Sequence, residues 1–191
     1  MTTGPQLFRL LSRVAAMGWL VLGRTARAQA IFDAMLRRWP GDAYALASRA
    51  HLHAQAGRHE LAIADARELV GRHPQASAAH WFNLAYLYEA ERRLDEAEAA
   101  FRQALALDAK LDRAWYGLGL TLIGLGRHDE AVAALKRNTE LQPMSPYGWY
   151  QLARAHMERH EPDETRKIIR HLKGFEPKVA AQLERETGVV S

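Results

Sequence analysis

Residues 112–145 read DRAWYGLGLTLIGLGRHDEAVAALKRNTELQPMS, and this stretch decides the fold. Its first half carries large apolar residues at spacings of three and four, up to a turn at Gly126. Its second half begins with Asp129 and Glu130 and stops at Pro143. Such spacings predict the buried face of a helix, acidic residues favour a helix start, and proline cannot continue a helix. The stretch therefore predicts two helices joined by a glycine turn.

The same pattern returns at a fixed interval along the chain. Trp81, Trp115 and Trp149 are evenly spaced and stand at the same place in three successive copies of it. With one extra residue in the second unit, five repeats fit, at residues 9–42, 43–77, 78–111, 112–145 and 146–179. Because neither helix of a repeat can bury its apolar stripe alone, neighbouring repeats must stack. The sequence predicts an all-α chain whose helices pack as antiparallel pairs.

The segments outside the repeats are short. We expect residues 1–8 to be a flexible N-terminus and residues 188–191 to be a flexible tail. Residues 178–187 predict one more helix, with Val179, Ala180 and Leu183 available to cover the apolar end of the stack. Stacked repeats need such a capping element at their ends.

The repeat resembles that of the tetratricopeptide repeat (TPR) family, which has the pattern W-x2-L-G-x2-Y, then A-x3-F, then P, at the same repeat length. The fourth repeat matches it at Trp115, Leu118, Gly119, Leu122, Ala131, Leu135 and Pro143. The resemblance covers residues 9–179 and implies a right-handed superhelical solenoid of helix pairs. The second repeat departs from the pattern, because Arg49 and His53 stand at core positions. We expect its first helix to be shifted or less tightly packed.

Composition excludes several classes of protein. The chain has 191 residues, 48% of them hydrophobic and 25% charged, which fits a globular chain with a full core. It has no cysteine, so disulfides, zinc-thiolate sites, iron–sulfur clusters and thiol nucleophiles are absent. The net charge is +4, and residues 1–42 alone carry six basic and two acidic side chains. Because this charge does not form one stripe, we do not expect nucleic acid or a membrane surface as partner.

The apolar run at residues 14–23 has two readings. It follows basic residues and precedes the small-residue motif at 28–30, which is the outline of a secretory signal. However, Arg24 and Arg27 interrupt that outline, and the run fits the repeat spacing. We therefore expect a retained helix and a cytoplasmic protein, with export as the alternative. The run is shorter than the ~20 residues that cross a bilayer, so no transmembrane segment is expected.

The TPR resemblance also implies which residues face a partner. In that family the first helices of the repeats line a concave groove, and several of their positions point into it. Mapped onto this chain, the candidate partner-binding residues are Tyr44, Phe82, Asn83, Tyr86, Arg113, Tyr116, Leu120, Ile123, Tyr147, Tyr150, Gln151, Arg154 and Met157. Rigid aromatic residues with a few polar anchors are typical of peptide recognition. The alternative is that these side chains cover one another or the capping helix.

We therefore expect a protein–protein interaction module of the adaptor or assembly-factor kind, which binds a peptide or helix of a partner protein. The alternative is a self-assembling scaffold or secretion-type chaperone that uses the apolar first helix, with Phe8, Leu11 and Trp19 in a homo-oligomer contact. The carboxylate clamp of chaperone-binding TPR proteins is incomplete here. A single carboxylate held by Asn83 and Arg113 stays open. The arginine- and alanine-rich composition suggests a bacterial source.

Catalysis, metals and cofactors are not expected. The chain has nine histidines, but His156 and His160 lack an acidic third ligand at a recognisable spacing. There is no nucleophile motif of the GxSxG kind and no phosphate-binding glycine loop. Acidic pairs such as Asp95 and Glu96 fall in the first turns of helices, where they complement the helix dipole. The sequence predicts no enzyme and no resident cofactor.

Overall fold

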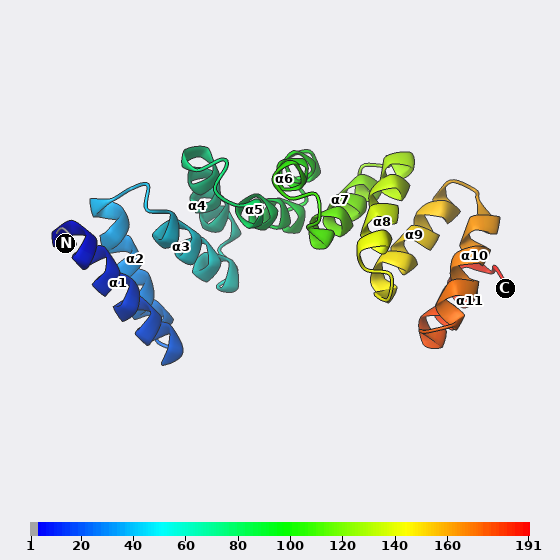
Figure 1. Ribbon diagram of the computed structural model, residues 1–191, viewed down its shortest axis with the longest axis horizontal. Helices are drawn as coiled ribbons and strands as arrows, with labels where there is room; N and C mark the ends of the chain where they lie inside the picture. Colours follow the sequence, from blue (N-terminus) through cyan, green and yellow to red (C-terminus); the bar gives the residue numbers. More distant parts are fainter. Residues whose placement is uncertain (1–3) are drawn as a thin grey trace. The chain divides into compact units, whose positions relative to one another are not determined.

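A computed structural model of the protein describes residues 4–191, and every regular element in that range is an α-helix (Figure 1). The chain divides inside α5 into two compact units, one ending at Leu87 and the other beginning at Tyr88. The helices are α1 (Gly4–Val21), α2 (Thr25–Arg38), α3 (Ala43–Gln55), α4 (His59–Arg72), α5 (Ala78–Ala90), α6 (Leu94–Leu107), α7 (Asp112–Gly124), α8 (His128–Leu141), α9 (Pro146–Glu158), α10 (Pro162–Lys173) and α11 (Pro177–Thr187).

Consecutive helices pack on one another within each unit. In the first unit, α1 packs on α2 and α3 on α4, and α2 contacts α3. In the second unit, α7 packs on α8 and α9 on α10, while α11 contacts both α9 and α10. Small, fully buried residues lie between paired helices: Ala16 and Ala28 between α1 and α2, and Ala153 and Thr165 between α9 and α10. Ala97 on α6 and Ala131 on α8 are fully buried at the equivalent position of their repeats. Small side chains let the two backbones approach closely, which buries both apolar stripes.

The turn inside each pair has one backbone geometry throughout. Its residue with positive φ is glycine in three turns, at Gly23, Gly57 and Gly126, but Arg92 (φ 60°) and His160 (φ 59°) in the other two. In all five turns, the backbone N–H of the following residue donates to the carbonyl five positions earlier, at 2.8–2.9 Å. This is the Schellman ending of a helix, which favours glycine at the left-handed position.

The second repeat keeps its first helix despite its polar core residues. Arg49 on α3 donates to Asp33 on α2 at 2.8 Å and to both carboxylate oxygens of Asp65 on α4, at 2.8 and 2.6 Å. The hydrogen bond to Asp65 raises the pKa of Arg49. Buried His53 accepts a hydrogen bond from Arg58 Nε at its Nδ1, at 3.0 Å. The expected shift of this helix does not occur because the polar side chains find partners on adjacent helices.

Both ends are more ordered than the sequence suggested. Helix α1 already begins at Gly4, so residues 4–8 of the expected flexible N-terminus are helical, and the ring of Phe8 lies 5.7 Å from that of Trp39. Residues 1–3 lie outside the described residues. Residues 188–191 are not a free tail: Val189 is buried in the core, and Ser191 donates to Glu184 through its N–H and its hydroxyl.

Replacing a strained turn residue should stabilise the protein. His160 holds a left-handed conformation that costs a non-glycine residue roughly 1 kcal/mol. We expect His160→Gly to raise the free energy of unfolding by about 1 kcal/mol, since glycine adopts this conformation without steric cost. The measurement is urea unfolding followed by circular dichroism. The matched variant Gly126→Ala should lower the same free energy by a similar amount, and a destabilised His160→Gly protein would contradict the expectation.

Stability should fall in mild acid. Burial lowers the pKa of His53, so the unfolded chain takes up this proton at a higher pH than the folded one does. The free energy of unfolding should therefore decrease as the pH falls below about 6.5, the ordinary histidine pKa, by at most ~1.4 kcal/mol per pH unit for one group. Urea unfolding at pH 7.5 and 5.5 measures this. The variant His53→Leu, with the residue that the fourth repeat carries at this position, should lose less stability over the same interval.

Candidate protein-binding surface

The thirteen candidate residues divide between the two units. Nine lie on α7 and α9 of the second unit: Arg113, Tyr116, Leu120, Ile123, Tyr147, Tyr150, Gln151, Arg154 and Met157. The other four lie in the first unit, namely Tyr44 on α3 and Phe82, Asn83 and Tyr86 on α5. All thirteen are half-buried or exposed, with 61% of Tyr86 and 71% of Tyr147 uncovered. The two first helices α7 and α9 contact each other, so the larger group shares one region of the second unit.

Tyr116 lies close to other candidate residues of this region. It is half-buried, and its hydroxyl is hydrogen-bonded to the side chain of Gln151 on α9. Burial raises the pKa of Tyr116, and the nearby Glu89 carboxylate acts in the same direction. Burial likewise raises the pKa of Glu89. The region therefore joins an aromatic ring to a partly desolvated carboxylate.

Tyr150 is tied to the capping helix. Its hydroxyl donates to the carboxylate of Glu186 on α11, and the Arg154 guanidinium lies 5.9 Å from the centre of its ring. The pKa of Tyr150 is raised mainly by the hydrogen bond to Glu186, and burial acts in the same direction. This candidate partner-binding residue thus connects α9 to the capping helix α11.

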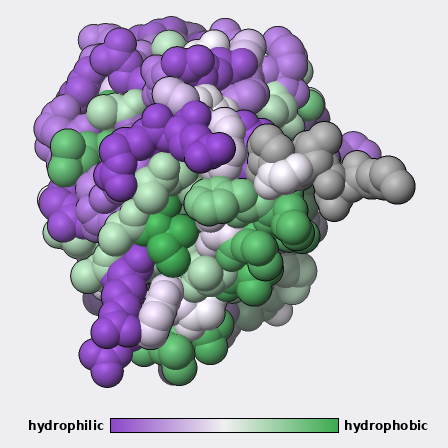
Figure 2. All heavy atoms as spheres, turned by 90° about the vertical axis from the view of Figure 1, so that its left-hand side faces the viewer, coloured by the Kyte–Doolittle hydropathy of each residue, from purple (hydrophilic) through white to green (hydrophobic). Residues whose placement is uncertain are grey.

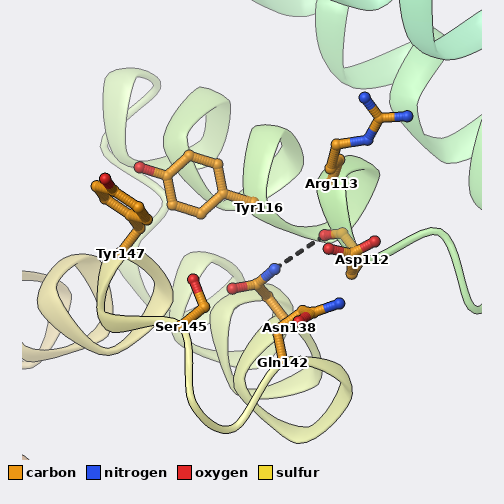
Figure 3. Close-up of a pocket in the computed structure, with 7 residues that line it drawn as sticks. All are labelled: Asp112, Arg113, Tyr116, Asn138, Gln142, Ser145 and Tyr147. Atoms are coloured by element: carbon orange, nitrogen blue, oxygen red, sulfur yellow. Dashed lines mark hydrogen bonds between the residues drawn. The ribbon is translucent and has the colours of Figure 1, made fainter. Parts of the chain in front are cut away.

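A cavity of about 420 Å³ opens beside Tyr116 (Figure 3). Figure 3 shows the rings of Tyr116 and Tyr147 side by side at one end of it, and Arg113 extending from α7 at the other. Its lining residues are Asp112, Arg113, Tyr116, Asn138, Gln142, Ser145 and Tyr147. The sequence pointed to three of these, and the structure adds the four that come from the start of α7, the end of α8 and the following loop.

Asn138 forms the floor of the cavity. It is 5% exposed, and its Nδ2 donates to the backbone carbonyl of Asp112 at 2.9 Å (Figure 3). Its Oδ1 lies so close to α9 that a Cβ at Gly148 would come within 2.1 Å of it. The sequence did contain a signal for this residue, because the other repeats carry apolar residues at the same position: Met35, Leu69, Ala104 and Leu172. A polar residue at a core position marks a specific buried hydrogen bond.

Close packing elsewhere holds α7 in place. A Cβ at Gly117 would lie 2.4 Å from Cζ of Phe101, which is 1% exposed, and a Cβ at Gly119 would lie 2.6 Å from Cγ of Leu135. These two glycines let α6 and α8 approach the buried side of α7. The opposite side, with Tyr116, is thereby presented outward on a rigid support.

The described residues contain no group of three or more histidine, aspartate or glutamate side chains that could hold a metal ion. His156 is 3% exposed and its Nδ1 lies 2.7 Å from Glu161 Oε2, so this histidine is paired within the core. None of the described helices has both the length and the apolar character needed to cross a membrane.

Comparison with known families agrees with the repeat geometry. Two family models, both described as tetratricopeptide repeat, match residues 20–77 and residues 88–150. The chain belongs to the tetratricopeptide repeat family. TPR chains are helical solenoids built from helix pairs, and they are in general protein–protein interaction modules without catalytic activity.

The curated relatives match a part of the chain. Protein O-mannosyl-transferase TMTC3 from Homo sapiens is 34% identical over 88 residues, which are 46% of this chain and 10% of that protein. BBSome complex member bbs-4 from Caenorhabditis elegans is 40% identical over 65 residues, 34% of this chain and 14% of that protein. This TPR chain therefore corresponds to a small fraction of the length of either relative.

Solved structures match nearly the whole chain. A crystal structure of MamA protein superposes with a TM-score of 0.80 at 20% identity, covering 94% of this chain and 93% of that one. YrrB, described as a TPR protein with an unusual peptide-binding site, has a TM-score of 0.80 at 15% identity, covering 89% and 88%. Identities this low show that the TPR fold is shared.

Truncation of the buried residue at the floor of the cavity should cost more stability than truncation of an exposed residue in its wall. Asn138→Ala removes a buried hydrogen bond and leaves a void between α7, α8 and α9, so we expect a loss of about 1–3 kcal/mol in the free energy of unfolding. Gln142→Ala, in the exposed wall of the same cavity, should change it by less than ~0.5 kcal/mol. Urea unfolding of both variants provides the comparison, and equal losses would contradict the assignment of Asn138 as the floor.

Proposed function

We propose that this TPR protein is a non-catalytic adaptor or assembly factor that binds a peptide or helical segment of a partner protein on α7 and α9. The observation that carries the proposal is the cavity lined by the half-buried ring of Tyr116, the exposed ring of Tyr147 and the polar residues around Asn138. Concave sites with aromatic walls and a few polar groups are the usual form of peptide-binding sites.

The chemistry of the cavity suits an extended or helical backbone. The two tyrosine rings offer apolar faces, and each ring ends in a hydroxyl that both donates and accepts. Gln142 and Ser145 add an amide and a hydroxyl along the same wall. These groups can pair with the N–H and C=O groups of a guest segment, while the rings cover its apolar side chains.

The charges around the cavity have both signs. Asp112 and Arg113 line it, and the Glu89 carboxylate near Tyr116 has the Arg92 cation close by. We propose supporting contacts to this guest from Leu120, Ile123, Gln151, Arg154 and Met157, all in the second unit. Taken by itself, the first unit offers Tyr44, Phe82, Asn83 and Tyr86 as proposed partner contacts of its own.

The relatives are consistent with a partner-binding role. The name of one denotes a BBSome complex member, and that of another, from Dictyostelium discoideum, denotes an anaphase-promoting complex subunit. The YrrB structure is described as having a peptide-binding site. These descriptions belong to those proteins, and they support assembly with other chains as the role of this one.

Self-association is a second candidate function, and it uses a different surface. Phe8 and Leu11 on α1 are 52% and 59% exposed, so both are available for a contact between copies. Trp19 is half-buried against the core of the first unit, with the Arg27 guanidinium 4.3 Å from its ring centre, so it contributes less. The cavity beside Tyr116 lies in the second unit and α1 lies in the first, so the two functions are tested with separate variants.

Loss of the two tyrosine rings should weaken peptide binding. A peptide library selected against the purified chain should yield ligands of roughly micromolar dissociation constant. We expect the double variant Tyr116→Ala/Tyr147→Ala to weaken the selected peptides at least ~10-fold, because buried aromatic anchors dominate such interfaces. Fluorescence anisotropy with labelled peptide measures the dissociation constant, and circular dichroism checks that the helices remain.

The control is Lys136→Ala, an exposed residue on α8 that does not line the cavity beside Tyr116. It should leave the dissociation constant unchanged. If the peptides bound the double variant as tightly as the original chain, their site would lie elsewhere and the proposal would be rejected.

A further inference from the structure

The outward face of α1 is the most apolar surface of the described residues. Thirteen large apolar side chains are exposed in residues 4–191, and eight of them belong to α1 and the residue that follows it: Leu7, Phe8, Leu10, Leu11, Val14, Met17, Val21 and Leu22. Figure 2 looks onto this end of the first unit and shows hydrophobic surface gathered there. Monomeric proteins rarely leave such a continuous apolar patch in water.

We call these eight residues the α1 face, and five of them form a single stripe along the helix. Leu7, Leu11, Val14, Met17 and Val21 recur at intervals of three and four, so they project from one side of the helix. The opposite side carries Ala16, which is fully buried in the core shared with α2. The helix is thus apolar on both sides, and only one of them is covered.

The two arginines of α1 are directed away from the α1 face. Arg13 donates to both carboxylate oxygens of Asp42, at 3.1 and 3.3 Å, and lies over the ring of Tyr44. Arg9 lies over the ring of Trp39, 4.6 Å from its centre. Every exposed residue between Leu10 and Leu22 is apolar or glycine. At one edge of the face, the Arg38 guanidinium of α2 lies 5.6 Å from the centre of the Phe8 ring. Along Leu7, Leu11, Val14, Met17 and Val21, two copies can therefore meet without bringing like charges together.

The size of the α1 face fits an interface between proteins. Its eight side chains are each about half exposed or more, and together they leave on the order of 800 Å² uncovered. A standard stable interface takes about that area from each partner. A second copy of the chain supplies a partner surface of the same area and the same apolar character.

The C-terminal helix of the second unit does not supply a matching surface. There α11 and Val189 cover the core, and the exposed residues of α11 include Lys178, Arg185 and Glu186. A head-to-tail contact would set the α1 face against these charges. A head-to-head contact about a two-fold axis covers both apolar faces at once and leaves neither open, which gives a closed assembly.

We propose that two copies of this chain pair through their α1 faces about a two-fold axis and form a closed dimer. This inference rests on the self-association described above and adds the full extent of its surface, its symmetry and its stoichiometry. Val14 lies midway along the stripe, so it faces or nearly faces its own copy across the axis when the two helices cross at their centres.

The first experiment measures mass and association by analytical ultracentrifugation of the full chain from 1 to 100 μM. We expect a species of twice the 21.5 kDa chain mass and no larger one. The variant Leu11→Glu/Val14→Glu should raise the dissociation constant at least ~100-fold, because it buries charges opposite like charges. Leu61→Glu replaces an equally exposed leucine on α4, at 51%, and should leave the dimer intact.

The second experiment tests the symmetry by cross-linking. Because the chain has no cysteine, a single introduced cysteine reports on one position only. We expect Val14→Cys to form a disulfide-linked dimer under mild oxidation, since its copy lies within disulfide distance. Leu61→Cys should stay monomeric on a non-reducing gel at the same concentration.

The possible outcomes distinguish failure of the closed dimer from failure of self-association as a whole. A monomer at 100 μM rejects self-association altogether. Growth into larger species with concentration keeps self-association but rejects the closed dimer. If the chain is monomeric and floats with vesicles that contain anionic lipid, whereas the Leu11→Glu/Val14→Glu variant does not float, the α1 face binds a membrane surface instead. None of these outcomes alters the peptide test on Tyr116 and Tyr147.

Discussion

Close contact between the two helices of each pair is the constraint on which the rest of the structure depends. It requires a small residue on each side, and Ala153 and Thr165 show why: both are fully buried, and the Thr165 hydroxyl donates across the gap to the Ala153 carbonyl at 3.1 Å. A larger side chain at either position would push the helices apart and expose both apolar stripes. The remaining packing, including the support of α7 beneath the cavity, depends on this close approach of the paired helices.

The repeat pattern made the helices predictable because it records that constraint at a fixed interval. The acidic first turns of α6, α8 and α10 lie where the sequence placed them, as do the glycine turns at Gly57 and Gly126. Two of the turns depart from the glycine pattern, and the repeat alone does not explain their geometry. At Arg92 and His160 the backbone bonds of the turn hold a non-glycine residue in the left-handed region, so packing decides the geometry and local preference does not.

What the sequence could not predict depends on contacts between distant side chains. Arg49 looked like a defect in the second repeat, but its guanidinium bridges Asp33 and Asp65, sixteen residues away on either side. The candidate surface shows the same limit. Family positions located Tyr116 and its neighbours, whereas the floor depends on Asn138, which breaks the apolar pattern in order to bond a carbonyl on α7. Single exceptions to a repeat carry information that the repeat itself does not.

The apolar surfaces of the first and last helices of the described chain are covered to different extents. Stacked helix pairs leave an apolar surface at each end, since the outermost helix lacks a neighbour. At one end α11 supplies that neighbour, and Val189 completes it. At the other end α1 keeps its outward stripe uncovered, while Arg9 and Arg13 are turned inward to Asp42 and the rings beside it. Both arginine side chains stay partly exposed, at 42% and 41%, but their pairing with Asp42 keeps them off the outward stripe. The stripe is thus left without a charge of its own, which is the condition that the proposed contact between copies requires.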